Sequence, residues 1–143
     1  DAAVDYVRGL DRASLPEFGS AAADPLIPRR IGDFAVQLEC ARAYPMSCAR
    51  KLETWPESYP SEGEATVEAF AVKVACVKAA LTVTGGIFDL TGARSTASTY
   101  RFDRFWRNAR TFATHDSTDV TEVWVGDWYL SRQQPPVGAI PRV

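Results

Sequence analysis

The 143-residue sequence predicts an all-α protein, a bundle of four to five helices in a single domain. Three observations predict this fold class. Apolar residues recur at three- and four-residue steps through most of the chain, which is the period of an amphipathic helix. Prolines and glycines gather in a few short segments between these stretches. No segment shows the alternation of apolar and polar residues that is typical of a strand, and no internal repeat stands out.

The first half of the chain predicts two helices. Residues 1–9 have the pattern of a helix end, and residues 11–25 that of a loop. Residues 26–53 predict an amphipathic helix, and Pro45 inside it should kink or split it, because proline removes a backbone donor. Residues 55–65 form a connector with two prolines and a glycine. The apolar face of the helix over 26–53 consists of Ile27, Ile31, Phe34, Leu38 and Ala41.

The second half begins with the clearest helix, over residues 67–83. It is apolar nearly all round, which predicts a place in the middle of the bundle or against a second subunit. Gly85 and Gly86 follow it and should weaken the helix while allowing another backbone to approach closely. Gly92 is expected to cap the helix end, and residues 93–99 to form a polar loop.

Two shorter helices are expected over residues 101–116 and about 117–131, followed by a tail. The arginines of the first should face solvent, with Asp103 and Arg107 paired across one turn. Either Asp116 or Ser117 could cap the start of the second. The residues expected to point inward are Phe102, Phe105, Trp106, Ala109, Phe112 and Ala113 on the first helix, and Val120, Val123, Trp124 and Trp128 on the second.

The composition gives no broad argument for nucleic acid or a membrane surface as a partner. The chain has 16 Lys+Arg and 18 Asp+Glu, a formal net charge of -2, and no apolar run approaches the ~18 residues that a membrane span requires. Cys40, Cys48 and Cys76 lack zinc-site spacing, so we expect no metal site. Buried or half-buried free thiols are the simplest interpretation, and they suggest a cytoplasmic location.

The chemically suggestive residues lie between residues 84 and 116. His115, the only histidine, ends a predicted helix. By periodicity alone it can be a cation at a helix C-terminus, a satisfied core group or a site residue. The segment TGGIFDLTGARST allows either close helix packing or the approach of a ligand phosphate. The signatures of nucleotide-binding loops, zinc sites and catalytic serines are absent.

An ordered set of motifs in residues 84–130 is similar to a known family. They are Gly92-Ala93-Arg94-Ser95, the segment DRFWRNART over 103–111, His115, and Val125-Gly126-Asp127. Together they resemble the C-terminal helical domain of the acyl-CoA dehydrogenase superfamily. Within it, the likeness is to the two-component flavin-dependent monooxygenase branch, which includes dibenzothiophene monooxygenase.

The resemblance implies a homotetramer with flavin at the subunit interfaces. Reduced FMN or FAD would come from a separate flavin reductase and react with oxygen to a C4a-hydroperoxyflavin, which oxygenates a small organic substrate. His115 corresponds to a histidine near the isoalloxazine ring that hydrogen-bonds the oxygen adduct or handles its proton. Arg94 and Ser95 correspond to loop residues that reach the flavin phosphate of a neighbouring subunit. Asn108 corresponds to a weaker polar contact on the same side.

Two alternatives remain open. An acyl-CoA dehydrogenase would need a glutamate base, yet no glutamate lies between Glu68 and Glu122, and His115 occupies the stretch where that base commonly falls. A non-catalytic oligomerisation bundle would explain the apolar helix over 67–83. The family also has an N-terminal helical domain and a middle β-domain, neither of which these residues contain. We therefore expect a fragment of a longer chain that contributes to a site without completing it.

Overall fold

The computed structural model describes residues 2–13 and 15–136, and every regular element within them is helical. This confirms the predicted all-α bundle. The elements are α1 (Ala2–Arg8), the 3-10 turn η1 (Ala21–Ala23), α2 (Leu26–Glu53), α3 (Glu62–Thr91), the 3-10 turn η2 (Ala93–Thr96), α4 (Asp103–His115) and α5 (Thr118–Ser131).

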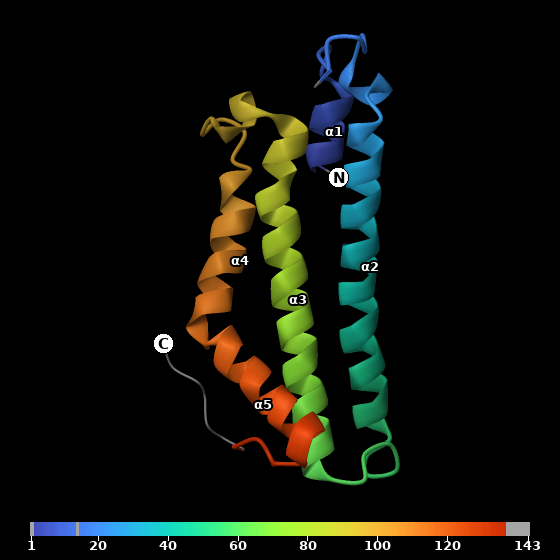
Figure 1. Cartoon of the computed structure of the whole chain (residues 1–143), viewed down its shortest axis with the longest axis vertical. Helices are drawn as coiled ribbons and strands as arrows, with labels where there is room; N and C mark the ends of the chain where they lie inside the picture. The colour runs from blue at the N-terminus through green and yellow to red at the C-terminus, as the bar shows by residue number, and fades with distance from the viewer. Residues whose placement is uncertain (1, 14, 137–143) are drawn as a thin grey trace.

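The helix α3 is the central element of the bundle (Figure 1). It runs antiparallel to α2, while α4 and α5 lie end to end along its other side and α1 packs near its C-terminal end. Its first turn is capped by Ser61, whose hydroxyl accepts from the N–H of Glu64 at 3.3 Å. Its end is set by Gly92, which has φ 72° and donates to the carbonyl of Phe88 at 2.8 Å. The predicted central position and C-terminal glycine cap are both confirmed.

The glycine pair of α3 does not interrupt the helix, because both positions are used for packing. A Cβ on Gly86 would lie 2.5 Å from Cζ of Phe34, a buried ring on α2. A Cβ on Gly85 would lie 3.7 Å from Cδ1 of Trp106 on α4. An aromatic ring from each neighbouring helix therefore lies over one glycine, whereas the sequence predicted the close approach of another backbone.

Pro45 does not split α2, which continues as one helix from Leu26 to Glu53. A proline at position 45 cannot donate to the carbonyl of Ala41, four residues earlier. That carbonyl instead accepts a hydrogen bond from the thiol of Cys76 on α3 at 3.3 Å. The neighbouring helix thus supplies the donor that the proline removes. The predicted apolar face of α2, which includes Ile27 and Phe34, is buried or half-buried throughout.

The inward faces predicted for α4 and α5 are only partly correct. Phe102, Ala113 and Trp128 are buried, and Trp124 packs against Phe70 with the ring centroids 5.4 Å apart. The structure corrects the prediction at five positions: Phe105, Trp106 and Phe112 are 39%, 42% and 63% exposed, and Val120 and Val123 are 39% and 59% exposed.

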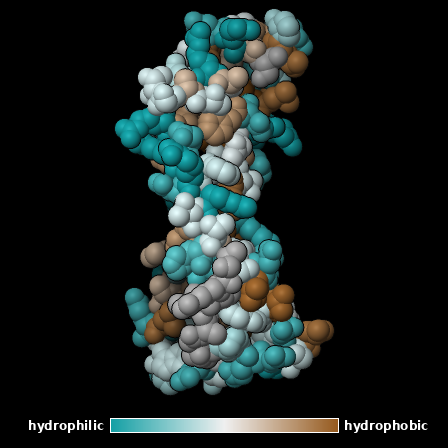
Figure 2. All heavy atoms as spheres, turned by 90° about the vertical axis from the view of Figure 1, so that its left-hand side faces the viewer, coloured by the Kyte–Doolittle hydropathy of each residue, from teal (hydrophilic) through white to brown (hydrophobic). Residues whose placement is uncertain are grey.

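The reason for this exposure is the width of the apolar stripe. Both helices pack mainly on α3, and a single neighbour covers only part of a stripe that wide. Figure 2 shows this side of the molecule, with apolar side chains open to the surface among hydrophilic ones. Among the cysteines, Cys48 is buried and Cys76 half-buried as expected, whereas Cys40 is exposed on α2.

The length and composition of α3 exceed what the sequence analysis expected. Over Glu62–Thr91 it is long and apolar enough to cross a membrane by these two criteria alone. The central helix of a bundle meets the same criteria, and α3 contacts α1, α2, α4 and α5 along its length. Only 11% of that apolar window is buried, however, so packing within the described residues accounts for only part of its apolar character.

Candidate functional site

His115 is the last residue of α4, and the chain changes direction there. The extended backbone of Asp116 (φ −126°, ψ 139°) ends the helix. Ser117 then caps α5 by accepting from the N–H of Val120 at 3.4 Å, which decides between the two predicted caps. The His115 side chain is 77% exposed. It projects from the α4–α5 junction, which excludes the alternative of a satisfied core histidine.

Asp116 connects His115 to the central helix. Its Oδ1 lies 3.1 Å from Nδ1 of His115, and its Oδ2 accepts a hydrogen bond of 2.8 Å from Nζ of Lys73 on α3. The side chains of Lys73 and Asp116 are only 20% and 24% exposed. The hydrogen bond from Lys73, reinforced by that to His115, lowers the pKa of Asp116 from its ordinary 3.8. The carboxylate is therefore ionised at neutral pH.

A groove of about 390 Å³ lies between α3 and the α4–α5 junction. Its walls include Leu81 of α3, Ala113 of α4 and Thr118 of α5, and Lys78 pairs with Glu122 across it at 2.5 Å. His115 does not line this groove. The described part of the chain therefore presents the imidazole at its surface without enclosing it.

Ser95 is a buried member of the η2 turn. Ser95 is only 1% exposed, and its hydroxyl donates to the carbonyl of Gly92 at 2.7 Å. The hydroxyls of Ser95 and Thr91 lie 2.6 Å apart, and Thr91 also bonds the carbonyl of Ile87 at 2.9 Å. These bonds tie the η2 turn to the end of α3. Any flavin contact by Ser95 stays a prediction.

Arg94, next to it, is exposed and borders a cavity of about 460 Å³. The cavity is also lined by Arg12 and Tyr6 from the N-terminal segment and by Gly92, where an added Cβ would meet nothing within 4 Å. Arg12 and Arg94 both line this cavity together with Asp89, and arginine is a side chain suited to binding a phosphate. Sequence reasoning missed Arg12, because its position in a loop far from Arg94 along the chain gave no signal.

The structure does not bring Arg94 and His115 together. They lie before and at the end of α4, a helix of 13 residues, which at 1.5 Å per residue spans about 20 Å. Asn108 lies between them, exposed on α4. Arg94 and His115 of one chain therefore cannot contact the same isoalloxazine ring. They can meet opposite ends of a flavin nucleotide, or two different flavins.

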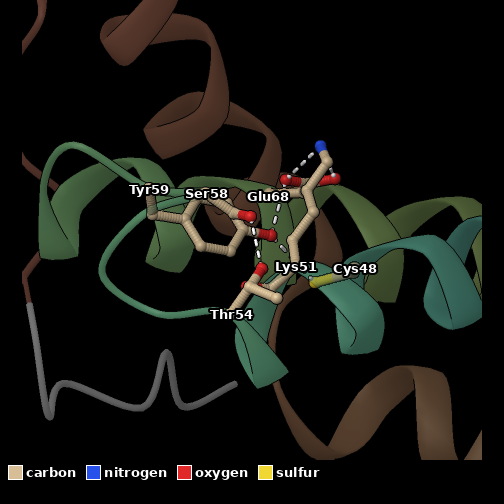
Figure 3. Close-up of polar contacts among 6 residues, drawn as sticks. All are labelled: Cys48, Lys51, Thr54, Ser58, Tyr59 and Glu68. Atoms are coloured by element: carbon tan, nitrogen blue, oxygen red, sulfur yellow. Dashed lines mark hydrogen bonds and ion pairs between the residues drawn. The ribbon is translucent and has the colours of Figure 1, made fainter.

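A separate polar cluster lies where α2 turns into α3 (Figure 3). Nζ of Lys51 donates to both carboxylate oxygens of Glu68, at 2.8 and 2.9 Å, and the hydroxyl of Tyr59 donates to the same carboxylate at 2.7 Å. Although burial would raise it, the pKa of Glu68 is held below its ordinary 4.5 by these hydrogen bonds. Sequence analysis missed this cluster, because its members come from α2, the connector and α3 and lie close together only in the folded chain. Its charges satisfy one another, so we assign it to holding the connector.

Comparison with known proteins establishes the family. Residues 1–120 match the family described as "Acyl-CoA dehydrogenase, C-terminal domain". The chain belongs to this family. The resemblance predicted from the Gly92–Ser95, 103–111 and His115 motifs is confirmed, and the matched region contains Arg94, Ser95, Asn108 and His115.

The relatives of this acyl-CoA dehydrogenase-type domain are flavin-dependent monooxygenases. The chain is 35% identical over 144 residues to dibenzothiophene monooxygenase from Mycolicibacterium goodii, an alignment that covers 96% of this chain and 35% of the relative. It is also 35% identical over 133 residues to the probable FMNH2-dependent monooxygenase SfnC of Pseudomonas putida, covering 87% of this chain and 34% of the relative.

Solved structures agree with this relationship. FMN-bound TdsC from Paenibacillus sp. A11-2 superposes with a TM-score of 0.83 at 29% identity, over 94% of this chain and 35% of that one. Methanesulfinate monooxygenase MsuC from Pseudomonas fluorescens gives a TM-score of 0.82 at 30% identity, over 93% of this chain and 36% of that one. The chain thus spans about a third of the length of its relatives.

Proposed function

We propose that this chain serves as the C-terminal helical domain of a reduced-flavin-dependent monooxygenase that oxygenates a small organic substrate. The observation that carries the proposal is the exposed His115, held by Asp116 at the end of α4, in a domain whose relatives are flavin-dependent monooxygenases. An imidazole in this position is open to a ligand that other parts of a larger enzyme would enclose.

The residues present are compatible with a flavin nucleotide. Arg94 and Arg12 offer paired, charge-assisted hydrogen bonds to its phosphate at one end of α4. His115 offers an exposed imidazole at the other end. A reduced FMN or FAD, delivered by a separate flavin reductase, would supply the activation of molecular oxygen. FMN is supported by two relatives, FMN-bound TdsC and the probable FMNH2-dependent monooxygenase SfnC.

His115 acts in this proposal as a proton donor and acceptor. Its Nδ1 is engaged by Asp116, so Nε2 is the nitrogen available to a ligand. An imidazole with Nε2 free can accept a proton from a ligand there and return it later in the cycle. The ionised Asp116 stabilises the imidazolium form when the proton is held.

We further propose that the enzyme is a cytoplasmic homotetramer. Support comes from a shallow groove of about 380 Å³ between α2 and α3, lined by Val36 and Ala41 on one side and Ala75 and Ala79 on the other. Val36 is 64% exposed, so a second copy could cover this groove. Sedimentation velocity of Val36→Glu should show weaker assembly than the wild type, with Leu26→Glu at the exposed start of α2 as the matched control.

The test of the proposed reaction uses His115→Ala in the full-length enzyme. With reduced FMN and oxygen, the variant should release more hydrogen peroxide per flavin oxidised and less oxygenated product. Arg107→Ala, which removes an exposed arginine paired with Asp103 at 3.0 Å on the same helix, is the control and should stay coupled. Unchanged coupling in His115→Ala contradicts the role of His115. Anaerobic bleaching of oxidised flavin by an acyl-CoA would instead establish a dehydrogenase.

A further inference from the structure

The two groups behind His115 form a chain of contacts that crosses from one helix to another. Nζ of Lys73 on α3 lies 2.8 Å from Oδ2 of Asp116, and Oδ1 of the same carboxylate lies 3.1 Å from Nδ1 of His115. Exposure rises along this chain, from 20% for the Lys73 side chain to 24% for Asp116 and 77% for His115. The inner end is anchored in the bundle and the outer end is open.

This order of burial determines which partner is fixed. Lys73 lies on the central helix, between half-buried neighbours, and its ammonium group faces the start of the α4–α5 junction. A lysine has donors but no acceptors, so the oxygen it binds must be an acceptor. Lys73 therefore fixes one oxygen of Asp116 and turns the other toward the ring of His115.

We propose that Lys73 and Asp116 are positioning residues that hold His115 as the Nδ1–H tautomer, with Nε2 free for the flavin side of the site. A carboxylate at Nδ1 can only accept a hydrogen bond, so the neutral imidazole must keep its proton on Nδ1. Nε2 is then an unprotonated acceptor until it receives a proton. This inference rests on the proposed function and names the residues that prepare its proton carrier.

The alternative reading of Lys73–Asp116 is a bond that merely secures the α4–α5 junction on α3. The chain contains a second, more exposed ion pair between α3 and α5. Lys78, five residues further along α3, pairs with Glu122 of α5 at 2.5 Å, and His115 is not part of this pair. Loss of Lys78 therefore tests the loss of an α3–α5 ion pair, with the oligomeric state of the variant checked because Lys78 also lines the groove between α2 and α3.

The tautomer can be measured without flavin, because His115 is the only histidine in the chain. Nitrogen-15 spectra of the labelled 143-residue chain, at alkaline pH where histidine is neutral, should show Nδ1 protonated and Nε2 unprotonated. Lys73→Met and Asp116→Asn should each shift the proton toward Nε2, since a freed carboxylate can rotate away and an amide can donate to Nδ1. Lys73→Arg should restore the wild-type spectrum, and Lys78→Met should leave it unchanged.

A second readout uses the full-length enzyme. Lys73→Met should raise the peroxide released per reduced FMN oxidised several-fold, with recovery in Lys73→Arg and no rise in Lys78→Met. A wild-type Nε2–H tautomer, a Lys73→Met spectrum identical to the wild type, or equal effects from Lys78→Met would overturn the inference. If the nitrogen spectra behave as expected but the enzyme never consumes reduced flavin and oxygen, the proposed function fails and the tautomer assignment stands.

Discussion

The thiol of Cys76 on α3 donates to the backbone carbonyl of Ala41 on α2, with 3.3 Å between sulfur and oxygen. This carbonyl is the one that Pro45 leaves without its helical donor. A buried or half-buried carbonyl without a partner costs free energy comparable to a lost hydrogen bond. The pairing therefore explains how a proline is accommodated inside a helix of 28 residues that packs along its partner without a break.

A double-mutant cycle should reveal this relationship. Cys76→Ala removes the donor and should lower the free energy of unfolding. In a Pro45→Ala background the helix N–H returns to the Ala41 carbonyl, so the same Cys76→Ala change should cost less. The expected coupling is about 0.5–1.5 kcal/mol, the range of a net hydrogen bond. Denaturant unfolding measures it, and equal costs of Cys76→Ala in both backgrounds would show that the thiol only fills space.

The adjacent glycines of α3 should respond oppositely to alanine. Gly86→Ala places a methyl group 2.5 Å from the buried Phe34 ring and should destabilise the chain by about 1–3 kcal/mol through overpacking. Gly85→Ala meets Trp106 at 3.7 Å, an ordinary contact, and should be neutral or stabilising by up to about 1 kcal/mol from helix propensity. Thermal unfolding distinguishes them. A Gly86→Ala variant as stable as Gly85→Ala would mean that Phe34 yields freely.

Acid should destabilise the chain through Glu68 and Asp116. The pKa of each carboxyl is lowered on folding from ordinary values of 4.5 and 3.8, so the folded state binds fewer protons than the unfolded one. Their contribution is complete above those ordinary values and is lost as pH falls through the folded-state pKa values. The melting temperature should therefore fall as the pH is lowered below about 4.5. Glu68→Gln should flatten part of this decline, whereas Glu57→Gln, an exposed residue of the connector, should reproduce the wild-type curve.

The sequence predicted the helices and their central member because these follow from apolar periodicity and from glycine and proline positions. It could not predict how much of each stripe the chain itself covers. Phe112 and Val123 have the same spacing as buried residues, and only the arrangement of α4 and α5 on one neighbour leaves them exposed. Burial depends on the neighbours of a helix, which its own period does not specify.

The residues of the candidate site could likewise be predicted only in part from the sequence. His115 and Arg94 were found because a family motif marks them, while Lys73 and Arg12 lie in segments without such a motif. Lys73 is 43 residues from Asp116 along the chain, and the bond between them exists because α3 passes behind the α4–α5 junction. Only the folded structure reveals a supporting residue such as Lys73, because the packing of the helices determines which residue it contacts.

Arg94 lies at the phosphate end of the proposed flavin site. Arg94→Ala in the full-length enzyme should weaken FMN binding by about tenfold to a hundredfold, because charge-assisted hydrogen bonds contribute about 1.5–3 kcal/mol. Arg94→Lys keeps the positive charge but loses the paired donors of the guanidinium group. Its affinity for FMN should therefore lie between those of the wild type and Arg94→Ala. Arg104→Ala, an exposed arginine whose guanidinium lies over the Phe105 ring at 4.7 Å, is the matched control. Fluorescence titration with FMN provides the dissociation constants. Equal FMN affinities for Arg94→Ala and Arg104→Ala would show that the phosphate does not bind at the η2 turn.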